Sequence, residues 1–215
     1  MIVVVGIPAW RQADPGGPAG LSCRVATAAA ARGAAVQLVG RVGDDPTGDA
    51  LLLALGRLGI GHAAVLRDPV RPTALVEAPA PEGEADLLEE LPARTGPGDG
   101  PRLEAADVSL GLSYIVAFSV LVVADDVPVA ALPAAVAAAE FAGAQLVVMV
   151  PQGRALPEGL PPGATVLAAP DAADDGEFAA LVGAYAAGLD AGLPPGDAFG
   201  AATRAAGAEA LQPSA

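Results

Sequence analysis

The sequence predicts an α/β protein with a mostly parallel central sheet. Short, almost continuous apolar runs recur along the chain, as expected for strands that are covered on both faces. Ala- and Leu-rich segments with helical spacing lie between them, and several end at a glycine. Strands that alternate with helices favour parallel pairing through right-handed crossovers. With 215 residues, 53% of them hydrophobic, we expect one domain over residues 1–215.

The first 60 residues show this alternation most clearly. Ile2–Val5 is a predicted strand that ends at Gly6, and Val36–Val42 is the second. The predicted helix between them runs from Ser22 to Arg32, and Gly33 ends it. The intervening PAWRQADPGGPAG reads as a loop because it is rich in Pro and Gly. The next helix is predicted from Asp45 or Thr47 as its cap and from the spacing of Leu51, Leu52, Leu55 and Leu58.

The remaining elements are predicted in the same way, and residues 61–102 form a possible lid or insertion. Two short strands, Ala63–Leu66 and Thr73–Ala78, would build that lid, and the Pro-, Gly- and acid-rich stretch from Pro79 to Pro101 would be a loop. Further along, we expect helix Glu104–Val116, strand Ser119–Val123, a helix from Pro128 to Gly143, strands Gln145–Val150 and Thr165–Ala168, a helix from near Glu177, and a last helix from Leu193 to Leu211.

Composition excludes several classes of function. A net charge of −14, with arginine as the only basic residue apart from His62, offers no footprint for nucleic acid, no P-loop lysine and no Schiff base. The single cysteine, Cys23, and His62 exclude an internal disulfide and the usual His- or Cys-rich metal sites. The longest apolar run, Gly111–Ala124, is shorter than the ~20 residues of a membrane-spanning helix. MIVVVG lacks a basic leader, so we expect a cytoplasmic protein without membrane partners.

Several segments resemble the ribokinase-like (PfkB) family of carbohydrate and nucleoside kinases. AGLSCRVATAAAARG is similar to the signature helix that ends at a glycine, here Gly33, with Gly43 ten residues later. Gly40–Ile60 (GRVGDDPTGDALLLALGRLGI) resembles the family's G-x-x-G-D-D-x-x-G segment and the helix after it. Arg71-Pro72-Thr73 resembles the turn that opens the next strand, and TVLAAPDAADDGE resembles the Pro-Asn-Glu segment.

The resemblance implies a three-layer α/β/α fold with a small lid remnant, and a site for a sugar or nucleoside. Its substrate-binding positions fall on Asp14, Gly20, Arg24, Gly43 and Asp44. Arg24 stands where the signature has Asn, Arg11 falls near the usual sugar-binding Asp, and Asp14 could substitute for that Asp. An Arg inside the pocket would favour an anionic ligand, whereas an Arg that points outward would be a surface residue.

The catalytic end departs from the family pattern. The family's Gly-Ala-Gly-Asp loop supplies backbone donors for the transferring phosphoryl group and an Asp base. Here the only Gly-Asp-Ala-Phe string is Gly196–Phe199, which makes Asp197 the candidate catalytic residue, and it equally fits an ordinary helix start. The stretch that would supply two late strands is missing after Gly183.

Two acidic runs could be mistaken for metal sites. Asp44, Asp45 and Asp49 suit the start of a capped helix better than a metal cluster, so no protein metal site is predicted there. The run Asp171–Glu177 suits a solvated first turn, with a phosphate-bridging divalent ion as the alternative.

These observations favour a ribokinase-like protein whose ATP-dependent phosphotransfer to a sugar hydroxyl is weak or lost. The alternative is an active sugar or nucleoside kinase with a minimal nucleotide site. ATP and Mg²⁺ are the expected cofactors if the protein is active, and none otherwise. A Rossmann-type dinucleotide enzyme is disfavoured because Gly6-Ile-Pro-Ala lacks the G-x-G-x-x-G turn. We also expect a homodimer through the predicted lid strands, because an exposed apolar sheet face usually marks a partner surface.

Overall fold

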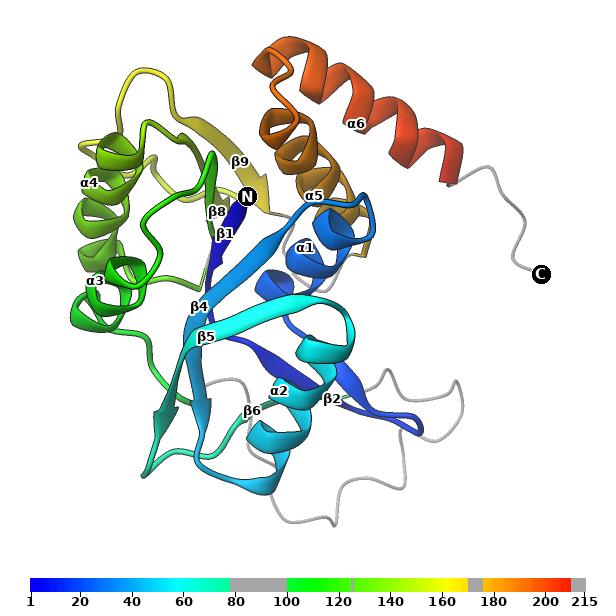
Figure 1. Cartoon of the computed structure of the whole chain (residues 1–215), viewed down its shortest axis with the longest axis vertical. Coiled ribbons are helices and arrows are strands. Elements are labelled where there is room, and N and C mark those ends of the chain that lie inside the picture. Colours follow the sequence, from blue (N-terminus) through cyan, green and yellow to red (C-terminus); the bar gives the residue numbers. More distant parts are fainter. Residues whose placement is uncertain (78–99, 125, 170–175, 210–215) are drawn as a thin grey trace.

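The computed structural model describes residues 1–77, 100–124, 126–169 and 176–209, which form two sheets and their covering helices (Figure 1). The central sheet has six strands in the order β5-β4-β1-β7-β8-β9, and a small sheet has three in the order β3-β2-β6. The strands are β1 Ile2–Val5, β2 Ala9–Gln12, β3 Gly17–Ala19, β4 Val36–Gly43, β5 Ile60–Asp68, β6 Ala74–Glu77, β7 Val120–Val123, β8 Gln145–Pro151 and β9 Thr165–Ala169. The helices are α1 Leu21–Ala30, α2 Pro46–Arg57, α3 Ala105–Ser113, the 3₁₀ turn η2 Val129–Ala131, α4 Leu132–Ala142, α5 Gly176–Asp190 and α6 Pro195–Glu209.

The central sheet is parallel throughout, as the apolar runs predict. β1 lies in its middle and pairs with β4 on one side and β7 on the other, Ile2 being opposite both Val36 and Val120. All four residues of β1 and all four of β7 are buried, because helices cover both faces of the sheet. The predicted α/β class and the parallel sheet are therefore confirmed.

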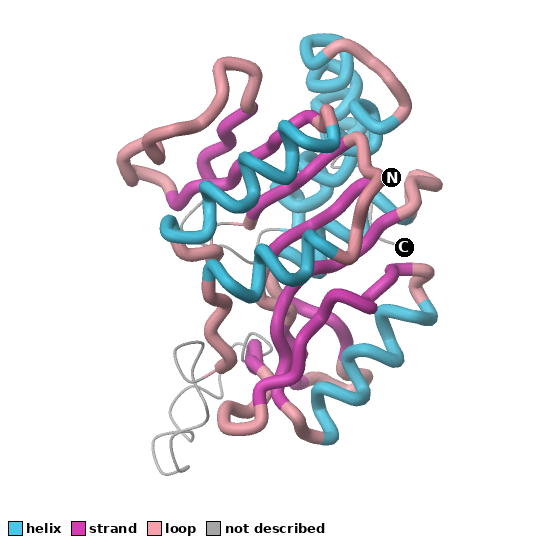
Figure 2. Tube along the Cα trace, turned by 60° about the vertical axis from the view of Figure 1, so that its left-hand side comes forward, coloured by secondary structure: helices cyan, strands magenta, loops and turns pink. Residues whose placement is uncertain are grey.

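Helices form a layer on each face of the sheet (Figure 2). α3 and α4 pack on one face, whereas α1 and α5 pack on the other with α6 outside α5. Small side chains permit the close packing of α1 on α5: a Cβ atom on Gly183 would lie 2.6 Å from the Cβ atom of Ala28. Small residues thus let α1 and α5 pack closely within one layer.

The predicted loop after β1 is partly wrong, because it contains the strands β2 and β3. β3 includes Gly17 and Pro18 and lies at an edge of the small sheet, where a proline costs no ladder hydrogen bond. The segment was predicted as a loop because it is rich in Pro and Gly, but β2 and β3 form an antiparallel hairpin in it. β2 also pairs in parallel with β6. Its turn includes the cis peptide bond Asp14–Pro15.

The predicted lid strands belong to two different sheets. Ala63–Leu66 lies within β5, the edge strand of the central sheet next to β4. Ala74–Glu77 forms β6 of the small sheet. The predicted loop from Pro79 to Pro101 lies almost entirely outside the described residues. Across the part of the chain that the structure describes, no helix combines the length and the apolar character needed to cross a membrane.

Candidate functional site

The candidate site lies where the carboxyl ends of β1 and β7 meet. β1 connects through α1 to β4 on one side, whereas β7 lies on its other side, so the chain changes direction at this pair of strands. Ligands of open parallel sheets bind in the crevice outside the carboxyl ends at such a point. At this edge the loop after β1, the amino end of α1 and Asp126 after β7 come together, and the position just outside them is here called the crevice.

The amino end of α1 presents unused hydrogen-bonding capacity to this crevice. Gly20 precedes the helix with a φ of 81°, a conformation that favours glycine, and among the described residues no side chain caps the first turn. Ser22, in that turn, is completely buried, and its Oγ has no hydrogen-bond partner in the part of the chain that the structure describes. Buried hydroxyls are nearly always bonded, so this serine indicates a place where a ligand or water can bind.

Gly6 allows three segments to meet at the crevice. A Cβ atom on this glycine would lie 2.6 Å from the Cβ atom of Ser22, 2.8 Å from that of Ala124 and 3.1 Å from Oδ1 of Asp126. The other oxygen of Asp126 accepts a hydrogen bond of 2.9 Å from the backbone amide of Ile7. Asp126 therefore holds the loop after β1 against the loop after β7 and places a carboxylate beside Ser22.

Cys23 does not supply a nucleophile to this site. Complete burial raises the pKa of its thiol to about 12; the charge of Asp126 contributes to the rise, and a hydrogen bond from the Ala9 backbone opposes it. A thiol with this pKa stays protonated and unreactive at neutral pH. The interpretation of Cys23 as a structural residue agrees with this environment.

The Gly-Asp-Asp segment forms a compact, hydrogen-bonded turn. The amide of Gly43 donates to Oγ1 of Thr73 over 3.1 Å, and that hydroxyl donates to Asp45 over 2.8 Å. Asp45 also accepts from the amides of Gly48 and Thr73, each over 2.7 Å, and so caps α2. Burial alone would raise the pKa of Asp45, but the hydrogen bonds from Thr73, Gly48 and Thr47 lower it overall.

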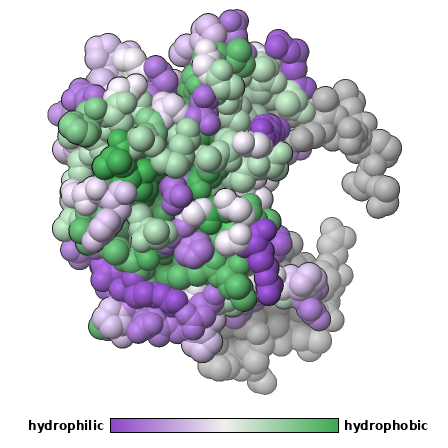
Figure 3. All heavy atoms as spheres, in the orientation of Figure 1, coloured by the Kyte–Doolittle hydropathy of each residue, from purple (hydrophilic) through white to green (hydrophobic). Residues whose placement is uncertain are grey.

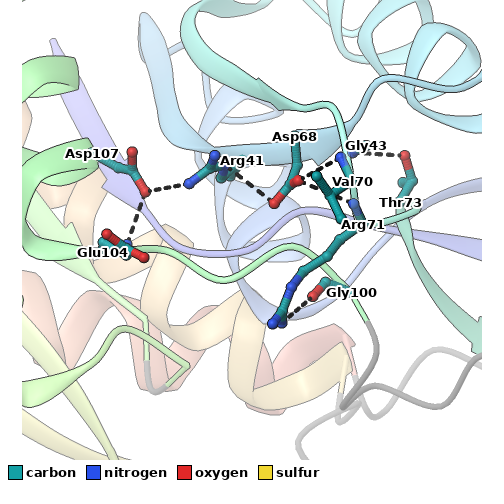
Figure 4. A network of polar contacts seen from close by, with 9 residues as sticks. All are labelled: Arg41, Gly43, Asp68, Val70, Arg71, Thr73, Gly100, Glu104 and Asp107. Carbon is teal, nitrogen blue, oxygen red and sulfur yellow. Dashed lines mark hydrogen bonds and ion pairs between the residues drawn. The ribbon is translucent and has the colours of Figure 1, made fainter.

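A second polar network ties the ends of β4 and β5 to α3 (Figure 4). Arg41 forms ion pairs with Asp107 (3.0 Å) and with Asp68 (3.4 Å). The backbone amides of Val70 and Arg71 each donate 3.0 Å hydrogen bonds to Asp68 and lower the pKa of its carboxyl. These contacts fix the loop that leads to β6, and the network thereby positions the small sheet. The carboxylates of Asp68 and Asp107 already have partners within this network.

The predicted substrate-binding residues lie along the carboxyl edge of the sheet, but they do not converge on one point. Gly20 borders the crevice, and Arg24, one turn further along α1, lies beside Gly176 of α5. Gly43 is the buried last residue of β4, and the exposed Asp44 lies 4.0 Å from the guanidinium group of Arg67. Asp14 is exposed in the turn between β2 and β3.

Asp197 lies at the other edge of the sheet. α5 ends at Asp190, whose carboxylate pairs with the amino group of Met1 and with the hydroxyl of Ser119, at the amino ends of β1 and β7. α6 begins just beyond this point, with Ala198 packed against Gly188. Asp197 is an exposed residue of the first turn of α6, and the structure does not bring it together with the other predicted residues.

Sequence reasoning overlooked two residues at the carboxyl edge. Ser22 gave no signal because a serine near a helix start usually serves only that helix. Asp126 shortly precedes Pro128, and this pattern indicates only a helix start. Glu177, the last residue of the acidic run named from the sequence, lies in the first turn of α5 and follows Gly176, which is beside Arg24. Among the described residues, no three His, Cys, Asp or Glu side chains gather in a group that could hold a metal ion.

Solved structures share the fold, two ribokinases among them, whereas no protein-family model and no curated protein matches the sequence. The crystal structure of Sa239 superposes with a TM-score of 0.71 at 16% identity, covering 100% of this chain and 95% of the other. The Giardia lamblia ribokinase gives 0.66 at 15% identity, covering 99% and 96%. The Arabidopsis thaliana ribokinase complexed with ribose and ATP gives 0.62 at 14% identity, covering 95% and 90%. The chain therefore has the ribokinase-like fold.

Proposed function

We propose that the protein binds a sugar or nucleoside in the crevice between β1 and β7, as a PfkB-type protein with weak or lost ATP-dependent phosphotransfer. The observation that carries the binding proposal is the buried, unbonded hydroxyl of Ser22 beside the uncapped start of α1. A ligand with several hydroxyl groups could accept from the first-turn amides and exchange hydrogen bonds with Ser22. The solved ribokinase complexed with ribose and ATP, which has the same fold, supports this choice of ligand class.

The weakness of phosphotransfer rests on the position of Asp197. A general base must come within hydrogen-bond reach of the hydroxyl that it deprotonates. Asp197 begins a helix at the amino edge of the sheet, whereas the crevice lies at the carboxyl edge. Within the described residues no strand follows β9, so the chain offers little structure to hold a nucleotide there. Loss of the base alone typically lowers turnover about 10²- to 10⁴-fold.

The alternative function, an active kinase with a minimal nucleotide site, has one favourable observation. α5 begins at the carboxyl edge, with Gly176 beside Arg24, so Glu177 is an acidic residue on the edge where the crevice opens. A Mg²⁺ ion there would depend on nucleotide phosphates and one or two carboxylates, because no ready-made group of three acidic side chains exists among the described residues. In this function Glu177, not Asp197, is the stronger candidate for the base.

A coupled assay of ADP release separates the two functions. The wild-type protein is tested with Mg²⁺, ATP and a panel of pentoses, hexoses and nucleosides, beside Glu177→Gln and Asp197→Ala. We expect turnover below the detection limit for all three proteins. Turnover that Glu177→Gln abolishes and Asp197→Ala preserves would establish the alternative, and turnover abolished by Asp197→Ala would refute both assignments.

Ligand binding is tested separately, by the change in melting temperature on adding each compound of the panel. We expect at least one sugar or nucleoside to stabilise the wild-type protein, and Ser22→Ala to weaken that effect while the protein stays folded. Ser109→Ala is the matched control, because this serine is exposed on α3 and donates to the Ala105 carbonyl. If no compound of the panel raises the melting temperature, the binding proposal fails.

The proposed homodimer would form through an edge of the small sheet. Among the described strands, β6 lies at the edge of the order β3-β2-β6, and unpaired strand edges are ready templates for a second chain. A competing surface is the apolar face over α3 and α4 (Figure 3), where Tyr114, Val116 and Phe141 are 69%, 77% and 88% exposed. Light scattering should give twice the 20.9 kDa chain mass, and a monomer at micromolar concentration would refute the dimer.

A further inference from the structure

α4 is apolar on almost every side, although the fold buries only one of its faces. Leu132, Ala135 and Ala139 are buried where the helix packs on β7 and β8, as the inner stripe of a surface helix should be. Glu140 is the only charged residue of the helix. The outward stripe, which repeats at helical spacing, is apolar as well and consists of Ala134, Ala137, Ala138 and Phe141. Because a helix that is apolar all round is normally buried, this pattern predicts a partner on the outward face.

The outward stripe of α4 lines a hollow of about 360 Å³ next to α3. Val116 and Phe141 are largely exposed at this hollow, and the exposed Tyr114 follows α3 directly. The rest of its wall comes from α3 and the residues after it, namely Ser109, Leu112, Ser113, Ile115 and Phe118. We call the hollow, together with Tyr114, the α3–α4 face, which belongs to the apolar surface over these two helices (Figure 3).

Charge makes this face a place where a second copy of the chain can approach. Each copy has a net charge of −14, so two copies repel each other wherever their acidic surfaces would meet. None of the residues that line the hollow is charged, so a contact there buries no unpaired charge. Glu140 lines a different, smaller hollow with Gly143 and Gln145, and so stays outside the contact.

The size and shape of the face also suit a second copy. Tyr114 is 69% and Phe141 88% exposed, and because an aromatic side chain buries about 150–250 Å², the two rings offer roughly 300 Å². A standard interface buries about 800 Å² on each partner, so the rings alone supply about a third of it. A two-fold contact requires a patch that complements itself. Here a protruding ring and a hollow lie side by side, so each copy can insert Phe141 beside the outward stripe of the other.

We propose that a second copy of the chain docks on the α3–α4 face, with the α3 and α4 helices of both copies packed about a two-fold axis. This inference rests on the proposed homodimer and assigns its interface to the second of the two surfaces named above. β6 has only four residues, and very short edge strands are poor templates for pairing. The α3–α4 face instead combines exposed aromatic rings with an uncharged hollow.

Cross-linking through introduced cysteines tests the proposal on the full chain. Cys23 is completely buried and stays protonated, so a thiol placed on the surface reacts before it does. We expect Ala137→Cys, on the outward stripe, to give a covalent dimer with a short bismaleimide. Leu156→Cys is the control, because Leu156 is 68% exposed outside this face, and it should remain a single chain. Leu75→Cys on β6 reports on the other surface.

Sedimentation of charged variants gives a second measurement. Phe141→Asp should weaken dimerisation at least tenfold, because buried aromatic residues dominate the binding energy of interfaces. Leu156→Asp adds the same charge at a similarly exposed apolar residue and should leave the dissociation constant within about twofold. Both positions are exposed in the single chain, so both variants should keep the wild-type circular dichroism spectrum.

The outcomes separate this inference from the proposals on which it builds. A dimer that Phe141→Asp leaves intact and that cross-links through Leu75→Cys would overturn the inference but preserve the homodimer. A wild-type chain that sediments as a monomer would overturn the homodimer and this inference together, and would leave sugar binding in the crevice untouched. Equal weakening by Leu156→Asp and Phe141→Asp would indicate general charge repulsion and would also overturn the inference.

Discussion

The segment from β4 to β6 and the segment from α5 to α6 each contain a string that resembles a motif of the ribokinase-like family, but only the first string is built into the fold. In the first segment, Gly43, Asp45 and Thr73 bond to one another and close a turn between two sheets. In the second, the Gly-Asp-Ala-Phe string begins a surface helix, with Gly196 and Asp197 exposed. Gly and Asp thus occur in the first segment as hydrogen-bonded partners in a turn and in the second segment as residues exposed to solvent.

This difference separates a motif that the fold uses from one that it does not use. The Gly-Asp-Asp turn stabilises the fold whether or not the protein is a kinase, because it caps α2 and holds the chain entering β6. A catalytic loop has no such folding role. A protein can therefore have the ribokinase-like fold and the first motif without the second, and the three predictions below test that separation.

The largest expected effect comes from adding one methyl group to each motif. A Cβ atom on Gly43 would overlap the carboxylate of Asp45 and the backbone amide of Thr73, whereas one on Gly196 would meet nothing within 4 Å. We expect Gly43→Ala to lower the free energy of unfolding by about 3 kcal/mol, the upper range for overpacking. Gly196→Ala should leave it unchanged or raise it by about 0.5 kcal/mol. Urea denaturation of both variants measures the two changes in the free energy of unfolding. Equal changes would mean that the two segments do not differ in how they contribute to the fold.

Removing the two acidic side chains should give a smaller but parallel contrast. Asp45→Ala removes the cap of α2 and leaves Thr73 without its carboxylate partner, so we expect a loss of about 2 kcal/mol in unfolding free energy. Asp197→Ala changes an exposed first-turn residue and should stay within about 0.5 kcal/mol. Thermal unfolding at pH 7 measures both. A loss above 1 kcal/mol in Asp197→Ala would give that residue a structural role that its exposure does not explain.

The smallest expected effect is the loss of stability at acidic pH. The folded pKa values of Asp45 and Asp68 are lower than their ordinary values, as is that of Asp190, where hydrogen bonds from Met1 and Ser119 outweigh the effect of burial. Carboxyls with depressed pKa values stabilise the fold above their unfolded pKa of about 3.9, and this contribution is lost as the pH falls through the folded pKa.

Melting temperature should therefore fall as the pH is lowered below about 4. Asp68→Asn should lose about 1 kcal/mol at pH 7 and show a shallower decline in acid, because one of the titrating groups is gone. Gly196→Ala, which alters no charge, should follow the wild-type profile. A pH profile of Asp68→Asn parallel to that of the wild type would mean that the hydrogen bonds from Val70 and Arg71 do not couple this carboxyl to folding.

Local sequence patterns predicted most of the architecture correctly. Four of the expected strands, near residues 2–5, 36–42, 119–123 and 145–150, begin within one residue of their observed positions because their apolar runs match buried parallel strands. The hairpin of β2 and β3 was missed because its pairing is long-range: β2 finds its second partner, β6, more than 60 residues later. Gly and Pro are residue types typical of turns, so Gly17 and Pro18 did not indicate that this segment is an edge strand.

The site was harder to predict than the fold. Gly20 was found through its place in a motif, but Ser22 matters through an unmet hydrogen bond and Asp126 through a contact with Ile7 across the crevice. Neither the unmet hydrogen bond nor the contact can be predicted from the neighbouring residues in the sequence. The Gly-Asp-Ala-Phe string pointed to Asp197, and only three-dimensional placement separates the start of α6 from the edge where β1 and β7 end.

The central position of β1 has a consequence for how fast the protein can fold. This four-residue strand is bonded on both sides, to residues 36–39 and to residues 120–123, so the middle of the sheet joins parts of the chain that are synthesised far apart. Closing such a long segment loses chain entropy before any contact compensates for it, and folding slows as the sequence separation of contacts grows. The unit of β4, α2 and β5 is local and can form early. The crevice can exist only after β7 has docked, so ligand binding should appear in the last kinetic phase of refolding.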